Sequence, residues 1–329
     1  MFNPDRRRFS ATLCAGLITL GLASVASAQS IRIGIASFGE HPQLNAAVAG
    51  FKKALAAEGF VEGKSVSYSS SHTNFDASLV PQMIAKLRAE QPKLILTVTT
   101  PVSQIAKKSL AGSGIPLVFA AVTDPVAAKL TPSWEQGDSG MTGASDLQDM
   151  SAILAFARKL VPQGKTFGIP YNPGEANDVA MVEKFKAAAP AAGFTVVSVG
   201  IDNVNDIQQR VASFKGKADV IYNPASNLLQ PAVSAVATAA RQIGLPLINA
   251  GEEAVRTGEA VASVAVGYEQ VGMNAGRLAA KVLRGVDIKT LGPTRPGASD
   301  HVTVISRKAL AAYKFSLPKE LEACNCFVD

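Results

Sequence analysis

The chain has 329 residues, of which 47% are hydrophobic and 18% charged, and its formal net charge is +6 at pH 7. This length suits two domains of ordinary size, each with a sizeable core. Beyond residue 28 the basic residues are spread among acidic ones without a basic run, which argues against nucleic acid as a partner.

The N-terminal segment has the three parts of a secretory signal. Arginines at positions 6–8 precede an apolar stretch at 11–25, and small residues follow at 26–28. The apolar stretch is too short to span a bilayer comfortably. We expect residues 1–28 to form a signal peptide that is removed on export to the periplasm. Arg6-Arg7-Arg8-Phe9 resembles a twin-arginine signal, so both the Sec and the twin-arginine routes remain open.

From residue 31 onward, short β-branched runs alternate with helical stretches. The first series predicts strands at 31–37, 65–70, 94–99 and 117–121 and helices at 43–58, 76–90 and 102–110. After a Gly-rich passage, the second predicts helices at 150–161, 175–192, 204–214 and 229–243 and strands at 166–170, 195–199, 219–222 and 247–249. A strand at 260–266, a helix at 268–284, a Pro/Gly-rich linker at 292–297, a strand at 301–305 and a short helix follow.

Two alternating series predict an α/β fold with two doubly wound parallel-sheet lobes. The C-terminal part is too short for a third domain, so we expect it to return to both lobes. Residues 29–143 with 260–297 would form the first lobe, and 144–259 with 298–329 the second. Three chain crossings would then make a hinge that permits closure.

Outside the predicted signal the chain has two cysteines, Cys324 and Cys326. Two ligands without a second pair make a poor metal site. In an oxidising compartment they could pair with each other or with another thiol. We expect neither a metal nor a cofactor.

A ligand of an open α/β sheet lies beyond the carboxyl ends of the strands, near helix N-termini. The junctions at these places carry hydroxyl, amide and carboxylate groups. Helix capping and turn formation would explain any one junction, but their convergence on facing lobes favours a ligand site. The expected ligand-binding residues are Ser37, Thr100, Pro101, Ser103, Gln104, Thr123, Asp124, Tyr171, Asn172, Asn177, Asn223, Ser226, Asn227, Gly251 and Glu252.

Distinct roles are expected within this set. Thr100, as a helix cap, with Ser103 and Gln104 would receive a carboxylate at a helix N-terminus. Asp124 and Glu252 are the anions available to a positive group, although Asp124 could instead form a turn before Pro125. At the first crossing, Asp146 either contributes to the site or caps the following helix.

One segment suggests an enzyme. Gly137-Asp138-Ser139-Gly140 is similar to the nucleophile loop of trypsin-like proteases, but Met141 breaks the pattern and the α/β alternation does not suit that fold. The sequence contains no phosphate-binding Gly-rich loop, zinc-protease helix motif or nucleophile elbow. We therefore expect a protein that is not an enzyme.

Several segments match a known family in order and spacing. They are Glu40-His41-Pro42, Thr100-Pro101-Val102-Ser103-Gln104, Pro116-Leu117-Val118-Phe119, Val122-Thr123-Asp124-Pro125-Val126, Gly140-Met141-Thr142-Gly143, Ser145-Asp146, Tyr171-Asn172-Pro173-Gly174-Glu175-Ala176-Asn177 and Tyr268-Glu269-Gln270-Val271-Gly272. Together they resemble the ABC-transporter substrate-binding family that includes tryptophan- and tyrosine-binding receptors. The resemblance covers essentially the whole chain after residue 28.

This resemblance implies a type I periplasmic-binding fold and a monomer that delivers a small polar organic ligand to an inner-membrane ABC permease. An amino acid is one candidate ligand. A sensor that presents its bound state to a membrane signalling receptor is the alternative function. The chain departs from the family at Ser226-Asn227, where Asp-Asn is frequent, so an ammonium group would lose a partner there.

Overall fold

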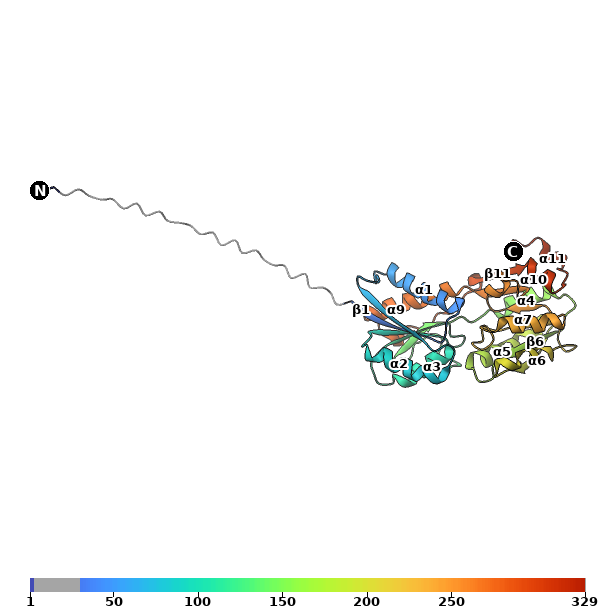
Figure 1. Cartoon of the computed structure of the whole chain (residues 1–329), viewed down its shortest axis with the longest axis horizontal. Coiled ribbons are helices and arrows are strands. Elements are labelled where there is room, and N and C mark those ends of the chain that lie inside the picture. Colours follow the sequence, from blue (N-terminus) through green and yellow to red (C-terminus); the bar gives the residue numbers. More distant parts are fainter. Residues whose placement is uncertain (3–29, 329) are drawn as a thin grey trace.

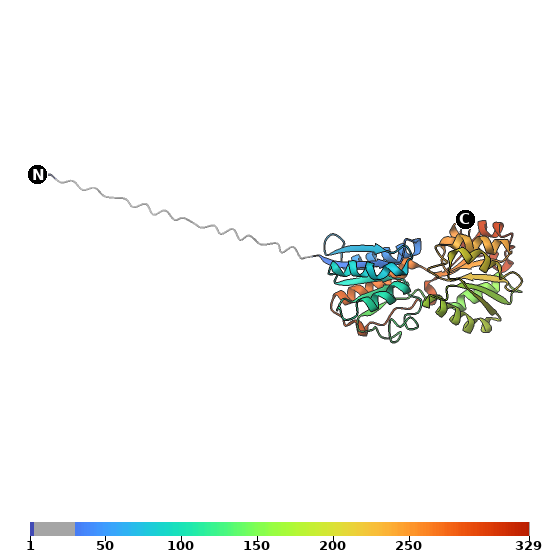
Figure 2. The same ribbon diagram turned by 60° about the horizontal axis from the view of Figure 1, so that its bottom comes forward.

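Two sheets divide the chain into two lobes that lie side by side (Figure 1). The computed structural model describes residues 1, 2 and 30–328, so the predicted signal peptide lies almost entirely outside the described residues. None of the helices in this described part is long and apolar enough to cross a membrane. Figure 2 shows the same two lobes from a second direction.

The first lobe is built on a five-stranded parallel sheet with the order β2-β1-β3-β4-β5. Its strands are β1 (Ile31–Ser37), β2 (Val66–His72), β3 (Leu94–Val98), β4 (Leu117–Ala120) and β5 (Met141–Ala144). Its helices are α1 (Pro42–Ala57), α2 (Val80–Ala89), α3 (Thr100–Ser109) and α9 (Tyr268–Leu283). Helices α1 and α9 cover one face of the sheet and α2 and α3 the other, which makes the lobe doubly wound (Figure 1).

The second lobe is built on a seven-stranded sheet with the order β12-β11-β10-β9-β8-β6-β7. Its strands are β6 (Thr166–Tyr171), β7 (Thr195–Gly200), β8 (Val220–Asn223), β9 (Leu247–Asn249), β10 (Ala262–Val266), β11 (His301–Ser306) and β12 (Phe327–Val328). Its helices are α4 (Met150–Leu160), α5 (Ala176–Ala188), α6 (Ile207–Ala212), α7 (Val233–Gln242), α8 (Glu253–Arg256), α10 (Arg307–Ala312) and α11 (Lys319–Glu322). All neighbouring strands are parallel except β10 and β11.

The structure corrects one part of the expected domain boundaries. Strand β10 hydrogen-bonds with β9 and β11, so residues 260–266 belong to the second lobe and not to the first. The chain returns to the first lobe only at α9. At the other boundary, the first sheet includes Ala144 through β5, a strand that the Gly-rich sequence did not predict. Cys324 and Cys326 form a disulfide with each other.

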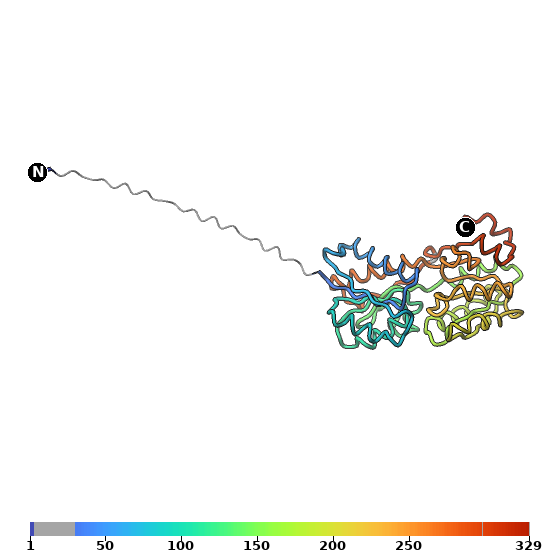
Figure 3. Tube along the Cα trace, viewed as in Figure 1, coloured from blue at the N-terminus to red at the C-terminus, as the bar shows by residue number. Residues whose placement is uncertain are grey.

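Helix α9 packs along α1 in the first lobe although more than 200 residues separate them (Figures 1 and 3). A Cβ atom on Gly272 would lie 1.9 Å from the carbonyl oxygen of Ala47. On the facing helix, a Cβ atom on Gly50 would lie 2.0 Å from the carbonyl oxygen of Glu269. The two helices therefore approach closely because glycine occupies both contact positions.

Three chain segments cross between the lobes: residues 145–149, Gly267 and residues 284–300. Hydrogen bonds tie these segments together. Ser145 N donates to Thr294 O at 3.0 Å, and Asp149 N donates to His301 Nε2 at 2.8 Å. Gln148 Oε1 accepts from Val266 N at 3.3 Å. The crossings thus form a connected hinge, which is the geometry that hinge closure of two domains requires.

Candidate ligand-binding site

Two small cavities, each of about 20 Å³, lie where the lobes face each other. The first is lined by Leu44, Thr99, Thr100, Ala121, Thr123, Asp146, Asn177, Ala225, Asn227 and Tyr268. The second shares four of these residues and adds His41, Gln43, Phe75, Ser226, Gln230 and Pro231. Each has room for about one water molecule, so the side chains of the two lobes nearly meet here.

Unpaired polar atoms make this interface the candidate ligand site. Two larger grooves of about 620–640 Å³ lie elsewhere on the first lobe, and a third of about 590 Å³ lies beside the hinge and shares Gln43 and Tyr268 with the second cavity. However, nine buried side-chain oxygens lack a hydrogen-bond partner among the described residues, and three of them, Thr99 Oγ1, Thr100 Oγ1 and Asn177 Oδ1, belong to residues that line the first cavity. Such atoms are rare in folded proteins and costly. Their convergence from both lobes on one cavity is what a polar ligand site requires.

The junction of β3 and α3 forms the wall of the first lobe. Thr99 precedes α3 with a φ of +87°, a backbone conformation that is strained for a β-branched residue. Its side chain makes no capping hydrogen bond within the described structure. The first N–H groups of α3 have no partners inside the helix, and the helix dipole favours an anion at this end. The junction therefore combines unpaired donors with two free hydroxyl groups.

A buried carboxyl group faces this junction from the first crossing. Asp146 is 3% exposed and accepts hydrogen bonds from Tyr268 Oη at 2.8 Å and Thr123 Oγ1 at 3.1 Å. Burial raises the pKa of Asp146, and these hydrogen bonds oppose the rise. Asp146 does not cap α4, because Asp149 accepts the N–H groups of Ser151 and Ala152. Tyr268 begins α9 directly after the second crossing, so the cluster links two hinge segments.

A network around Glu175 forms the wall of the second lobe. Glu175 Oε2 accepts from Asn227 Nδ2 at 2.6 Å and from Asn177 Nδ2 at 3.2 Å. Asp178 accepts from Asn172 N at 2.6 Å and from Asn177 Nδ2 at 2.9 Å. Burial and then the charge of Glu175 raise the pKa of Asp178 well above its usual value. The network fixes the first turn of α5 at the interface.

The structure brings five of the predicted site residues to the two cavities: Thr100, Thr123, Asn177, Ser226 and Asn227. Pro101 occupies the first turn of α3, directly after Thr100. Asn172 does not line either cavity but belongs to the hydrogen-bond network around Glu175. Gly251 approaches the other lobe, since a Cβ atom there would lie 2.1 Å from Gln43 Nε2.

The remaining predicted residues bind within the protein. Ser37 donates to Gly39 O, and Ser103 Oγ bonds with Thr97 Oγ1 and donates to Thr99 O. Asn223 donates to Asn249, Glu252 pairs with Arg256, and Tyr171 packs against the core of the second lobe. Asp124 accepts the N–H groups of Val126 and Ala127 and forms an ion pair with Lys184 of the other lobe.

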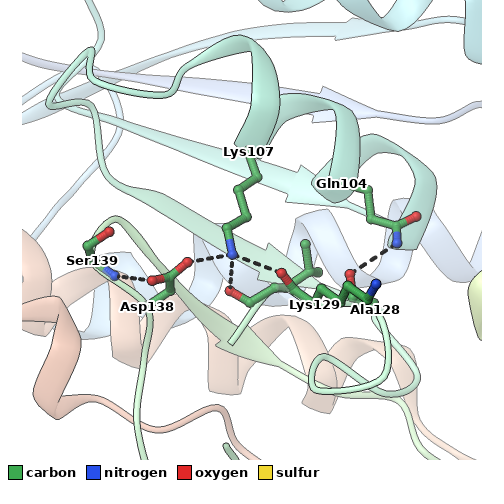
Figure 4. Close-up of polar contacts among 7 residues, drawn as sticks. Gln104, Lys107, Ala128, Lys129, Asp138 and Ser139 are labelled. Carbon is green, nitrogen blue, oxygen red and sulfur yellow. Dashed lines mark hydrogen bonds and ion pairs between the residues drawn. The ribbon is translucent and has the colours of Figure 1, made fainter. Parts of the chain in front are cut away.

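Figure 4 shows where Gln104 and the protease-like segment lie. Gln104 Nε2 donates to Ala128 O at 3.0 Å, which holds the turn after β4 instead of facing the other lobe. Asp138 forms an ion pair with Lys107, whose Nζ also donates to Lys129 O at 2.8 Å. Asp138 Oδ1 accepts the N–H of Ser139. These contacts give the Gly-Asp-Ser-Gly segment a structural role in the first lobe.

Sequence reasoning missed Leu44, Phe75, Ala225 and Tyr268 as lining residues. The first three are apolar and leave no chemical pattern in a sequence. Tyr268 did leave a signal, because it lies at the boundary between a strand and a helix that belong to different lobes. Its position beside a crossing therefore made it a candidate for the interface.

The chain matches the ABC transporter substrate binding protein family over residues 32–324. A relative named tyrosine-binding protein, from Clostridioides difficile strain R20291, is 32% identical over 288 residues, which cover 86% of this chain and 82% of the relative. An arabinose-binding protein from Geobacillus stearothermophilus, at 14% identity and a TM-score of 0.60 over 87% of this chain and 99% of that one, shows a shared fold alone. That fold is the type I periplasmic-binding fold expected from the sequence.

Two solved relatives differ in how well they superpose. The complex of a Streptococcus pneumoniae ABC domain with L-Trp has a TM-score of 0.84 at 26% identity, covering 91% of this chain and 100% of that one. The ligand-free, open structure of a Clostridium difficile substrate-binding protein has a TM-score of 0.69 at 29% identity, covering 91% and 99%. At similar identities, the chain therefore superposes better on the L-Trp complex than on the ligand-free, open structure. The chain belongs to the ABC transporter substrate-binding protein family.

Proposed function

We propose that this protein is the extracytoplasmic, monomeric receptor of an ABC importer and that it captures an amino acid with an aromatic side chain. The observation that carries the proposal is the set of unpaired buried oxygens of Thr99, Thr100 and Asn177, which come from both lobes. A ligand with polar groups would satisfy these atoms only when the lobes are closed. Differential contacts of this kind shift a protein towards its closed state.

The chemistry of the walls suits an amino acid. Its carboxylate would bind at the N-terminus of α3 with the hydroxyl of Thr100, and Asp146 supplies the negative charge for its ammonium group. Phe75, Leu44 and Pro231 line the adjoining cavity and offer apolar surface for a ring. The tyrosine-binding relative and the L-Trp complex support the same ligand class.

Each cavity is far smaller than an amino acid, so binding requires the lobes to open about the hinge and close again around the ligand. Small-angle scattering should therefore show a smaller radius of gyration for the saturated protein than for the open ligand-free protein. An unchanged radius at proven saturation would count against closure.

Calorimetric titration with tyrosine, tryptophan and phenylalanine tests the ligand class, with leucine and arabinose as controls. The protein should first be unfolded and refolded to remove any bound solute. A ligand at a hundred times its Kd should add about 2.7 kcal/mol to the free energy of unfolding. If none of the aromatic amino acids binds, the proposed ligand class is wrong.

Two further experiments test export and import. Mass spectrometry of the exported protein should find a mature N-terminus at Gln29, and a species that retains residues 1–28 would contradict the proposed cleavage. Cells that lack the gene should take up labelled ligand more slowly. Unchanged uptake in cells without a second importer for that ligand would contradict the proposed role.

A further inference from the structure

Glu175 holds two asparagines that belong to different segments of the second lobe. Its Oε2 accepts from Asn227 Nδ2 at 2.6 Å, from Asn177 Nδ2 at 3.2 Å and from the main-chain N of Asn227 at 3.3 Å. Its Oε1 accepts from Asn172 Nδ2 at 3.0 Å. Asn177 and Asn227 line the interface cavity, whereas Glu175 is not among the lining residues. Glu175 therefore binds two lining residues without lining the cavity itself.

These contacts fix the direction of both amide groups. An ionised carboxylate can only accept hydrogen bonds, so the nitrogen ends of Asn177 and Asn227 must face Glu175. Asn177 Nδ2 also donates to Asp178 Oδ1 at 2.9 Å and to Ala225 O at 3.4 Å. Its oxygen end is buried, and no described residue donates to it. Because residues of the second lobe bind the nitrogen end, the oxygen is the atom that can accept a hydrogen bond from a ligand at the interface.

Turning the Asn177 amide over would place its oxygen against the Glu175 carboxylate. A protonated Asp178 could donate to the turned oxygen, but that oxygen would still face the Glu175 carboxylate. Glu175 stays an acceptor, because Asn172 and Asn227 both donate to it. The orientation therefore follows from the network and not from an arbitrary choice between oxygen and nitrogen.

We infer that Glu175 is a positioning residue that turns the amide oxygens of Asn177 and Asn227 towards the cleft, where they recognise the ammonium group of the ligand. An ammonium group carries three donors and needs acceptors arranged around it. Asp146 lines the same cavity and supplies the charge, while the amide oxygens supply direction. The inference rests on the proposed function, since it presumes an amino-acid ligand.

Two ligands that differ only in the amino group test this inference. Affinities for tyrosine and for its des-amino analogue 3-(4-hydroxyphenyl)propionate should be measured for the wild type, Asn177→Leu and Glu175→Gln. If tryptophan or phenylalanine binds best, indole-3-propionate or 3-phenylpropionate replaces the analogue. Glu183→Gln, an exposed position on α5 outside the network, is the matched control. Thermal unfolding of each variant shows whether it is folded.

Asn177→Leu should lose about 10- to 100-fold in affinity for the amino acid and less than about threefold for the analogue. Glu175→Gln should lose the same selectivity by a smaller factor, although it does not touch the ligand, and Glu183→Gln should keep it. Equal losses for both ligands, or an unchanged preference for the amine, would overturn the inference while leaving the proposed function intact. If Asn177→Leu does not fold, Glu175→Gln decides. If the wild type binds none of the amino acids, both proposals are wrong.

Discussion

Lys184 of α5 and Asp124 of the first lobe form an ion pair across the interface, with 2.8 Å between Lys184 Nζ and Asp124 Oδ2. The Asp124 side chain is 7% exposed, whereas that of Lys184 is 38% exposed. Neither residue lines the interface cavities. The pair therefore joins the closed lobes without taking part in the proposed ligand contacts.

Removing this pair should weaken ligand binding by destabilising the closed state. Lys184→Met should raise Kd by about fivefold, corresponding to about 1 kcal/mol for a pair of which only the lysine is partly exposed. Asp124→Asn should raise Kd similarly, because it removes the charge that pairs with Lys184. Its remaining oxygen can still accept the N–H groups of Val126 and Ala127, so the turn is kept. Titration calorimetry at low and high salt measures Kd for each protein. High salt should reduce the difference in Kd between each variant and the wild type.

Lys186→Met is the matched control for Lys184→Met. Lys186 lies on the same helix but pairs with Glu183 of that helix. If both lysine variants bind equally well, the interlobe pair does not stabilise the closed state.

The Thr100 hydroxyl should serve the ligand and not the helix. Thr100→Val keeps the shape but removes a buried oxygen that no other described residue satisfies. Affinity should fall by about 1–3 kcal/mol, while the unfolding midpoint stays constant or rises. Titration and differential scanning calorimetry measure the two effects. Thr131→Val is the control, since the Thr131 hydroxyl is also buried and unpaired within residues 30–328 but does not line the cavity. Equal affinities for the two variants would contradict a ligand role for Thr100.

Asp146 should make stability depend on pH. Its pKa is raised above 3.8, mainly by burial, so the folded protein holds this proton more tightly than the unfolded chain does. Its contribution to stability is fully present below the unfolded value and is lost as pH rises through the raised value. Relative to Asp146→Asn, which does not titrate, the wild type should lose unfolding free energy as pH rises from the ordinary range of an aspartic acid through the raised pKa of Asp146.

Urea denaturation of both proteins at several pH values measures this difference. Asp178 also has a raised pKa, but it titrates in both proteins and cancels. If the difference in unfolding free energy between the two proteins stays constant with pH, Asp146 does not cause the pH dependence.

The contact between α1 and α9 should not accept a side chain at Gly272. In Gly272→Ala the new Cβ would lie 1.9 Å from Ala47 O, so the helices must separate. The free energy of unfolding should fall by about 1–3 kcal/mol, and chemical denaturation measures it. Gly140→Ala is the control, because a Cβ there meets no described atom within 4 Å. Equal stability of the two variants would show that the helix pair adapts at little cost.

The fold could be predicted largely from the sequence because alternating strands and helices have distinct periods. The boundary near residue 260 could not, because a single β-branched run does not show which sheet it will join. Strand β5 was missed since Met141-Thr142-Gly143-Ala144 contains a glycine and no continuous β-branched run. In the site, Thr100, Asn177 and Asn227 could be anticipated from their place at strand ends. Asp124 could not be assigned, because its partner Lys184 lies 60 residues later in the other lobe.

Helix α9 also constrains how the chain can fold as it is made. Phe51, Leu44 and Ala47 of α1 are buried in the core that α9 completes, yet α9 is synthesised after most of the second lobe. A nascent chain that stops before residue 268 therefore exposes this apolar face of α1. The two lobes cannot fold one after the other in order of synthesis, and a chaperone that shields exposed apolar segments would act on the first lobe until residue 283 has emerged.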